Sequence, residues 1–240
     1  MERKHFLKSL LVGAFSTPAL LSACSKTDEV APTTTGSTTG TTGTGSSTCA
    51  VAPTETEGPF PTKVPASYVR SDITDGKAGY KMTVKITITD SNNNCAALAG
   101  ALVDIWHCDA EGNYSEYGGT GMQSTNYQAV HFLRGRQTTD SNGLVTFTSI
   151  FPGWYSGRAT HIHVHVYNTN GTSLKVTQIA FPEGTGTAVA AVNGYNKGLS
   201  GYTSNSKDNV FSDGVTQELA TVTGSTSAGF DLSITLAVPA

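Results

Sequence analysis

The sequence predicts an all-β domain, a β-sandwich whose strands are joined by long loops. The chain contains 26 glycines together with many threonine, serine and asparagine residues, a composition that favours numerous turns. Several segments alternate between apolar and polar residues, which is the pattern of a strand with one buried face. These are residues 81–89, 161–167 and 230–238, with shorter strand-like runs at 101–107, 144–149 and 175–181.

The first 24 residues have the features of an export signal and not of a folded segment. Three basic residues precede a short apolar run at 10–21, which is too short to span a bilayer as a mature helix. The run ends in Leu21-Ser22-Ala23-Cys24, which resembles the lipobox of bacterial lipoproteins. We expect lipidation of Cys24 and anchoring to a bacterial membrane, on its periplasmic or cell-surface side. The alternative is an ordinary secretory signal cleaved near Ala23.

Residues 25–48 are predicted to be a flexible linker. Every residue from Thr33 to Thr48 is Thr, Gly or Ser, so this stretch has no apolar surface to bury and cannot offset its ordering entropy. A glycan acceptor region is the alternative that this composition leaves open. The remaining residues, 49–240, have a length that suits one domain.

Local signals place further elements within residues 49–240. The sequence Asp140-Ser141-Asn142-Gly143 predicts a hairpin turn ahead of the 144–149 strand. The 175–181 run is expected to pair with the 161–167 strand. Residues 184–215 are rich in glycine, asparagine and serine and are predicted to form a long loop.

Charge gives no indication of a nucleic-acid-binding protein. The formal net charge is −3 and charged residues make up only 14% of the chain. No basic stripe is visible in the sequence, and nucleic-acid binding depends on one. The sequence also shows no internal repeat and no further transmembrane candidate.

The cysteines predict one disulfide. If Cys24 is lipidated, Cys49, Cys95 and Cys108 remain, an odd number for an oxidising compartment. If residues 97–107 form one extended strand, Cys95 and Cys108 lie about 30 Å or more apart. A disulfide tolerates only about 7 Å between Cα atoms. We therefore expect a Cys49–Cys95 bond and a free Cys108.

The strand at 161–167 carries the most informative pattern in the chain. Its apolar residues point to one face of a strand and its three histidines to the other. Imidazole is a good ligand for iron, zinc and copper. Three of the six histidines at a spacing of two favour a metal site over scattered surface histidines. The two faces are Ile162, Val164 and Val166 against His161, His163, His165 and Tyr167.

Motifs on either side of this strand complete an ordered set. Pro152-Gly153 predicts a turn that presents Tyr155, and Arg158 stands three residues ahead of His161. Together these motifs resemble the intradiol ring-cleavage dioxygenases, the non-haem iron(III) family that includes catechol and protocatechuate dioxygenases. The resemblance covers about residues 54–211. Its further motifs are Thr56-Glu57-Gly58-Pro59-Phe60, Val103-Asp104-Ile105-Trp106-His107, Gly112-Asn113-Tyr114, Phe132-Leu133-Arg134-Gly135, Thr139-Asp140 with Gly143, and Gln178.

The resemblance implies a β-sandwich of the intradiol dioxygenase core type with an Fe(III) cofactor. Its ligands would be Tyr114, Tyr155, His161 and His163. Two phenolates and one hydroxide would neutralise the ion, and two neutral imidazoles would complete five-coordination. Deprotonating a free tyrosine at pH 7 costs about 4 kcal/mol. A bound cation offsets that cost, because it inverts the usual local preference for the neutral phenol.

The resemblance also implies the reaction. A catechol-type substrate would bind the iron through both oxygens, in place of Tyr155 and the hydroxide. Iron would act as Lewis acid and template, and O2 would open the ring between the hydroxylated carbons to a cis,cis-muconate-type diacid. Arg158 would stabilise charge on the ring and Gln178 would support it. Gly58 and Pro59 would line the substrate pocket, and His165 is expected to support the metal ligands or the fold and not to bind the metal.

Two other functions stay open at this point. A non-catalytic secreted β-sandwich binding module would account for the fold and the linker. A zinc or copper site could use His161, His163 and His165. We expect no long helical region between the linker and Thr56 of the kind that supports dimers in catechol dioxygenases. The sequence therefore leaves the oligomeric state open, as it does the choice of catechol.

Overall fold

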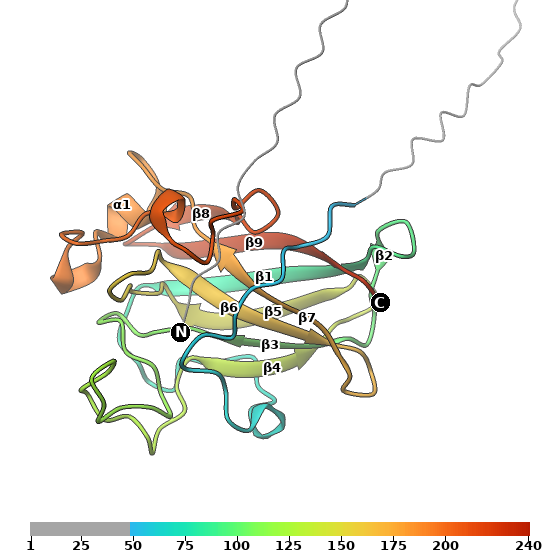
Figure 1. The fold of residues 1–240 in the computed structure, drawn as a ribbon, viewed down its shortest axis with the longest axis horizontal. Helices are drawn as coiled ribbons and strands as arrows, with labels where there is room; N and C mark the ends of the chain where they lie inside the picture. The colour runs from blue at the N-terminus through green and yellow to red at the C-terminus, as the bar shows by residue number, and fades with distance from the viewer. Residues whose placement is uncertain (1–48) are drawn as a thin grey trace, which may run out of the picture. The chain divides into compact units, whose positions relative to one another are not determined.

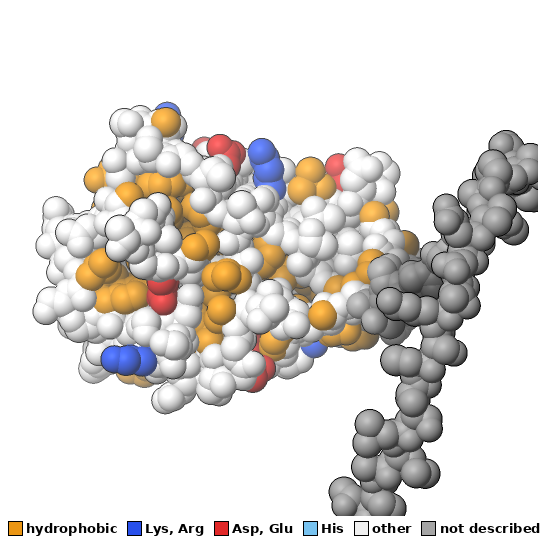
Figure 2. Space-filling model, turned by 90° about the horizontal axis from the view of Figure 1, so that it is seen from above, with side chains coloured by type: hydrophobic (Ala, Val, Ile, Leu, Met, Phe, Trp, Pro, Cys, Tyr) orange, Lys and Arg blue, Asp and Glu red, His pale blue; other side chains and the backbone are white. Residues whose placement is uncertain are grey.

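The computed structural model describes residues 49–240, which contain nine β-strands and one short α-helix (Figure 1). The predicted leader at 1–24 with Cys24, and the predicted linker at 25–48, lie outside the described residues. Within residues 49–240, no helix is long and apolar enough to cross a membrane. The charged side chains on the face drawn in Figure 2 are few and lie apart from one another.

One sheet has five strands. Its central strand is β1 (Lys81–Asp90), which pairs in parallel with β9 and antiparallel with β2 and β5. β9 in turn pairs antiparallel with β8. The other strands are β2 (Ala96–Ala97), β5 (Leu144–Ile150), β8 (Thr221–Ser225) and β9 (Gly229–Val238).

The second sheet has four antiparallel strands in the order β4-β3-β6-β7. β6 carries the three histidines and is flanked on both sides, so its side chains are held by two neighbours. The register places His163 opposite Trp106 on β3 and opposite Gln178 on β7. The strands are β3 (Leu102–Trp106), β4 (Arg134–Thr138), β6 (His161–Tyr167) and β7 (Ser173–Ala180).

The core lies between the two sheets and explains the alternation in the sequence. Apolar residues of β1 such as Val84 and Ile86 are fully buried, as are Ile162 and Val164 on β6. The prediction of an all-β sandwich is confirmed. The histidine face of β6 is also buried, because a second layer of chain covers it.

This layer includes residues 52–60, which we call the N-terminal strap (blue to cyan in Figure 1). The strap begins at the edge of the first sheet, where Ala52 N donates to Ala237 O at 3.0 Å. It then lies along β7, where Glu55 N donates to Val176 O at 3.0 Å and Thr56 O accepts from Gln178 Nε2 at 2.9 Å. Its course brings residues from the start of the domain onto the histidine strand.

Three local predictions need correction. The turn at 140–143 forms, with Gly143 N donating to Asp140 O at 3.0 Å, but it is not a hairpin. It joins β4 in one sheet to β5 in the other, and these strands pair with β3 and β1 instead. Residues 97–107 are not one extended strand, since β2 ends at Ala97 and β3 begins at Leu102. The predicted loop at 184–215 contains the short helix α1 (Ala188–Val192) and two 3-10 turns.

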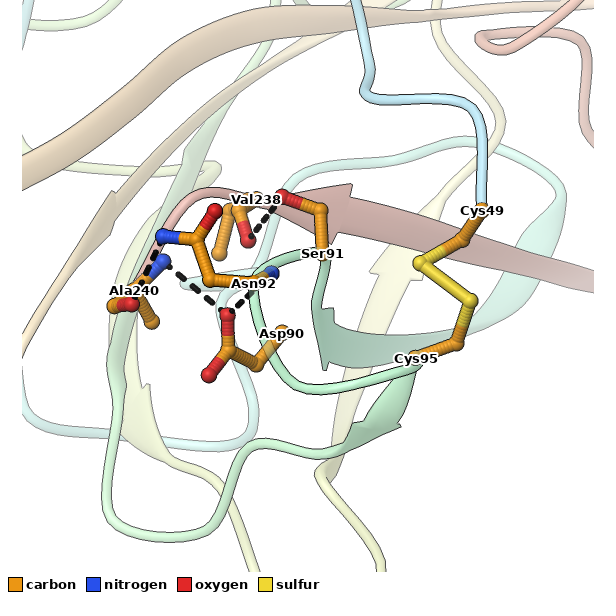
Figure 3. The surroundings of a disulfide bond; sticks show 7 residues. All are labelled: Cys49, Asp90, Ser91, Asn92, Cys95, Val238 and Ala240. Atoms are coloured by element: carbon orange, nitrogen blue, oxygen red, sulfur yellow. Dashed lines mark hydrogen bonds between the residues drawn. A yellow bond between two sulfur atoms is a disulfide. The ribbon is translucent and has the colours of Figure 1, made fainter. Parts of the chain in front are cut away.

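Cys49 and Cys95 form a disulfide, with their Cα atoms 5.7 Å apart (Figure 3). The bond joins the start of the described chain to the turn that follows β1. The same turn is held to the C-terminal strand, because Ser91 N donates to Val238 O at 2.9 Å. Cys108 is free and buried, and burial raises the pKa of its thiol far above the ordinary value. This thiol is therefore protonated and unreactive.

Candidate metal centre

β6 presents two imidazoles to one point. His161 and His163 are two residues apart, so their side chains lie on the same face of the strand. Their Nε2 atoms are 3.2 Å apart. Both residues are buried, and Trp106 stacks flat on the His163 ring at a centroid distance of 4.8 Å. Trp106, which is most simply a packing residue, therefore also fixes the plane of one imidazole.

Tyr114 reaches the same point from the loop after β3. Its hydroxyl oxygen is 3.2 Å from His161 Nε2, and the residue is fully buried. The Gln123 amide clamps its backbone by accepting from Tyr114 N at 2.7 Å and donating to Tyr114 O at 2.8 Å. Gly112 allows this loop to approach the next one, since a Cβ there would lie 2.3 Å from Trp154 O. The glycine thereby brings the two tyrosine-bearing loops together.

Tyr155 completes the set and is the member with most access to solvent. Its ring meets those of Tyr114 and His161 edge-on, each at a centroid distance of 5.7 Å. Its residue is only partly buried, whereas the other three are buried. The structure thus brings together all four residues that the sequence predicted as metal ligands.

Electrostatics keep these four groups neutral when no cation is present. Burial lowers the pKa of His161 and of His163 well below the ordinary value. Burial raises the pKa of Tyr114 far above its ordinary value and also raises that of Tyr155. His161 Nδ1 lies 2.6 Å from the Ala159 carbonyl oxygen and donates to it, so its Nε2 lone pair points at the cluster.

The donor set fits a metal ion with oxygen and nitrogen ligands. The Tyr114 hydroxyl and His163 Nε2 both crowd the lone pair of His161 Nε2. A cation at this point would satisfy these donors together and would offset the cost of ionising the phenols. Over residues 49–240 there is no group of three or more His, Cys, Asp or Glu side chains suited to a metal. The candidate centre is therefore the mixed set of tyrosines and histidines.

Arg158 stands beside the donors with its guanidinium held on two sides. Its Nη2 donates to Gln178 Oε1 at 2.5 Å, and its Nε donates to Asp208 at 2.8 Å. Nη1 faces the candidate metal ligands and lies 3.4 Å from the Tyr155 hydroxyl and 3.3 Å from His161 Nε2. Burial lowers the pKa of Arg158, but Tyr155 and Asp208 outweigh this effect and the pKa is raised.

Gly58 and Pro59 lie where the strap meets the centre. A Cβ on Gly58 would lie 3.1 Å from His163 Cε1, and the residue has a φ of 69° that favours glycine. Both properties allow the strap to pass close over the imidazole. The next residue, Phe60, stacks on Tyr114 at 4.8 Å. Pro59 lines a cavity beyond it.

His165 is not part of the cluster. Its Nε2 is 2.7 Å from Ser173 Oγ, and its Nδ1 is 2.8 Å from the Tyr167 hydroxyl and 3.0 Å from Glu57 Oε1. The third histidine thus ties the strap to the sheet. A zinc or copper site made of three histidines is not assembled in this structure.

Comparison with known proteins now identifies the family. A family model described as Dioxygenase matches residues 61–223. The solved intradiol ring-cleavage dioxygenase from Tetranychus urticae is 31% identical, with a TM-score of 0.69 over 80% of this chain and 96% of that one. The chain belongs to the intradiol ring-cleavage dioxygenases. No curated protein sequence matches the chain.

More distant intradiol dioxygenases share the fold. The 3-chlorocatechol 1,2-dioxygenase from Rhodococcus opacus 1CP is 19% identical, with a TM-score of 0.53 over 78% of this chain and 72% of that one. The catechol 1,2-dioxygenase from Pseudomonas arvilla C-1 is 21% identical, with a TM-score of 0.50 over 78% and 62%. These likenesses support the family's β-sandwich architecture, and at such identities they bear on the fold alone.

No motif or spacing in the sequence predicts a role for Asp208. Its carboxylate accepts from Arg158 Nε, from Ala159 N at 2.8 Å and from Val210 N at 3.0 Å, and the residue is buried. It lies 50 positions after Arg158, in the segment predicted to be a loop. Only the three-dimensional arrangement identifies it as the group that orients this intradiol dioxygenase's arginine.

Proposed function

We propose that the protein is an Fe(III)-dependent enzyme that uses O2 to cleave the ring of a catechol-type substrate. The carbon–carbon bond between the two hydroxylated carbons would break, and both atoms of O2 would enter the two carboxyl groups of a cis,cis-muconate-type diacid. The observation that carries the proposal is the convergence of Tyr114, Tyr155, His161 and His163 on one buried point, with Arg158 facing it.

Ferric iron suits this donor set. Two phenolate oxygens supply negative charge to a trivalent ion, and two imidazoles that burial keeps neutral supply lone pairs. Bound iron would act as a Lewis acid and as a template for the two substrate oxygens. The four side chains would be held in place by the β6 backbone, by Trp106 and by the clamp of Gln123 on Tyr114.

The protein's own groups have separate tasks in this proposal. Tyr155 is the donor nearest to solvent, so its hydroxyl oxygen is placed to accept a proton from an incoming catechol hydroxyl. Arg158 Nη1 lies 3.4 Å from that oxygen and would stabilise negative charge on it and on the adjacent ring. Gln178 and Asp208 would keep the guanidinium in that orientation.

Metal analysis and product analysis test the proposal. Protein reconstituted with ferric iron should be coloured by tyrosinate-to-iron charge transfer, and catechol under O2 should yield a muconate-type product by mass spectrometry. His161→Ala and His163→Ala should each lose most of the iron. His165→Ala is the matched control on the same strand and should keep it, while Tyr155→Phe should retain some iron with an altered response to catechol.

Two results would overturn the proposal. One is a colourless protein that takes up no iron after reconstitution, which would favour a non-catalytic binding module. The other is a product cleaved beside, and not between, the two hydroxylated carbons. Binding of zinc or copper that survives His161→Ala would point to a different metal site.

We also propose that the enzyme is exported and anchored to a bacterial membrane through lipid on Cys24. The basic and apolar leader that ends in Leu21-Ser22-Ala23-Cys24 supports this. Cys24→Ser should move the protein from the membrane fraction to the soluble fraction. Ser47→Ala, a control within the Thr/Gly/Ser segment, should leave the fractionation unchanged. An unchanged pattern for Cys24→Ser would refute the anchor.

A further inference from the structure

A cavity of about 590 Å³, lined in part by Pro59 and Phe60, lies beside the candidate metal centre. Ligand sites for drug-sized molecules have about 300–1,000 Å³. The cavity is therefore large enough for a substantial group in addition to a single ring. Its lining includes Pro59, Phe60, Lys63, Tyr117, Gly121 and Met122.

The N-terminal strap runs from the candidate metal ligands to the wall of this cavity. Gly58 lies against the His163 ring, and Phe60, two residues later, forms part of the cavity wall. The Phe60 ring also contacts both candidate tyrosine ligands, stacked on Tyr114 at 4.8 Å and edge-on to Tyr155 at 6.1 Å. One aromatic ring thus separates the cavity from the point where the catechol oxygens would bind.

The lining favours a flat, apolar group. Phe60 and Tyr117 meet edge-on at 5.3 Å, so the cavity is bordered by aromatic surface. Met122 also lines the cavity and is 70% exposed, so its side chain is free to contact a ligand there. A methionine can adapt its shape to different ligands and makes favourable contacts with aromatic rings.

The lining also has a positive charge. Lys63 Nζ lies 4.9 Å above the Tyr117 ring and donates one hydrogen bond to Glu116 O at 2.8 Å. An ammonium group has three donors, so two remain for a ligand. Glu116 also lines the cavity, but its carboxylate is engaged elsewhere: it accepts from Lys63 N at 2.9 Å and from the Tyr68 hydroxyl at 2.7 Å and lies 3.6 Å from Arg134, so it leaves the Lys63 ammonium available. The cavity therefore complements an anion at the end of an apolar group.

We propose that this cavity binds the distal part of the substrate, and that the preferred substrates are catechols with an aromatic or conjugated side chain bearing a carboxylate. The catechol ring would bind at the candidate metal ligands. The substrate's side chain would pass Phe60, and its carboxylate would contact Lys63. This inference rests on the proposed function for the head of the substrate.

A substrate panel tests the charge. For the iron-loaded full chain, kcat/KM is measured with 3,4-dihydroxycinnamate and with its neutral methyl ester, and the acid-to-ester ratio is compared between variants. Lys63→Met should lower this ratio about two- to fivefold, the effect of one exposed ion pair. Lys63→Arg should restore it. Lys85→Met, which removes an exposed lysine of β1 on the other sheet, is the matched control and should not change the ratio.

Filling the cavity tests its volume. Gly121 lines the cavity, has no heavy atom within 4 Å of a Cβ position and does not have a positive φ, so a side chain can be added there without strain. Gly121→Phe should lower the kcat/KM ratio of 3,4-dihydroxybiphenyl to catechol by about tenfold or more, as steric exclusion in an apolar pocket does. Gly121→Ala, which adds only the Cβ, should change the ratio little.

Binding without catalysis separates this inference from the proposed function. The chain has three methionines, so methyl-labelled methionine gives a simple NMR spectrum. Cinnamate, which has no catechol hydroxyls, should shift the Met122 methyl signal and leave that of the core residue Met82 in place. If catechol is not cleaved but this shift occurs, the proposed reaction fails and the binding site stands. Unchanged ratios in Lys63→Met and Gly121→Phe, together with an unshifted Met122 signal, would overturn the inference.

Discussion

Two buried arginines, Arg134 and Arg158, lie within the domain and differ in how completely their donors are used. Arg134 is fully buried, and burial lowers its pKa. Four of the five N–H groups of its guanidinium donate to internal acceptors: Ser115 Oγ at 2.9 Å, Ser115 O at 2.6 Å, Phe60 O at 3.0 Å and Thr62 Oγ1 at 3.1 Å. Arg158 has two of its nitrogens fixed by Asp208 and Gln178, and the third faces the candidate ligands.

The difference shows which of two buried cations is available for chemistry. Arg134 joins the strap to the loop that carries Tyr114, and its four hydrogen bonds all go to that scaffold. Arg158 is held in place by Asp208 and Gln178, and its Nη1 atom faces the candidate metal ligands. We therefore assign a structural role to Arg134 and a functional role to Arg158, and variants of each arginine and of its neighbours test this assignment.

Arg134→Met should have the largest effect, and the effect should be on stability. It removes four hydrogen bonds and leaves the buried Glu116 carboxylate without its arginine. Breaking a buried pair in this way costs about 3–5 kcal/mol. Urea unfolding should show a lower midpoint with an unchanged slope. A variant as stable as the parent would contradict the scaffold role.

Arg158→Met should act mainly on turnover. Loss of a positioned charge-stabilising group costs about 10²–10³ in kcat. Iron content and charge-transfer colour should be kept, because the four ligands remain. Stability should fall less than in Arg134→Met, since Asp208 keeps the backbone donors of Ala159 and Val210. Steady-state kinetics at saturating catechol is the measurement, and an undiminished kcat would remove Arg158 from the mechanism.

Two buried carboxylates, Glu218 and Glu116, should give opposite pH dependences of stability. Burial raises the pKa of Glu218, which accepts from Gln178 N, to about 7 from its ordinary 4.5. As pH rises from 4.5 to 7, the unfolded state loses this proton first, so stability falls, by up to about 3 kcal/mol. For Glu116, burial raises the pKa, but bonds from Lys63 and Tyr68 outweigh burial, so the pKa is lowered and its contribution is lost as pH falls.

Glu218→Gln isolates the contribution of Glu218 to the pH dependence of stability. The variant lacks the titrating group, so the difference in unfolding free energy between Glu218→Gln and the parent should grow in favour of the variant from pH 4.5 to pH 7 and then level off. Urea unfolding at a series of pH values measures it. A difference that does not vary with pH would show that Glu218 is not buried as described.

Asp208→Asn should have the smallest effect and the most specific one. The amide keeps the shape and one acceptor but loses the charge that holds Arg158 Nε. We expect a kcat lower by about tenfold, the equivalent of about 1.4 kcal/mol, with unchanged iron content. In the Arg158→Met background the same change should cost little, because coupled residues are not additive. Additive losses would show that Asp208 acts independently of Arg158.

Much of this architecture could be predicted because local patterns encode it. The strand predicted at 161–167 has the bounds of β6, and the i, i+2 spacing alone places His161 and His163 side by side. The 230–238 strand is likewise close to β9. Tyr114 and Tyr155 came from the family resemblance, since neither lies in a periodic segment. Their convergence depends on close loop approach at Gly112, which the structure shows.

The rest depends on contacts between distant parts of the chain. Asp208 follows a 3-10 turn in a polar segment, and no spacing relates it to Arg158. The turn at 140–143 has hairpin chemistry, but the sheet that each flanking strand joins is decided by tertiary packing. Lys63 and Met122 are unremarkable in sequence, and they are brought together only because the strap lies over the loop that carries Tyr114.

The Cys49–Cys95 disulfide has a mechanical consequence. It stands just ahead of the strap, whose Gly58 lies against His163 and whose hold on β7 is a few hydrogen bonds. A pull arriving along the chain before Cys49 passes through the covalent bond into the turn after β1, and from there into the long pairing of β1 with β9. Part of such a force therefore bypasses the strap, and the covalent bond limits how far a displacement of the chain before Cys49 can move Gly58 relative to His163.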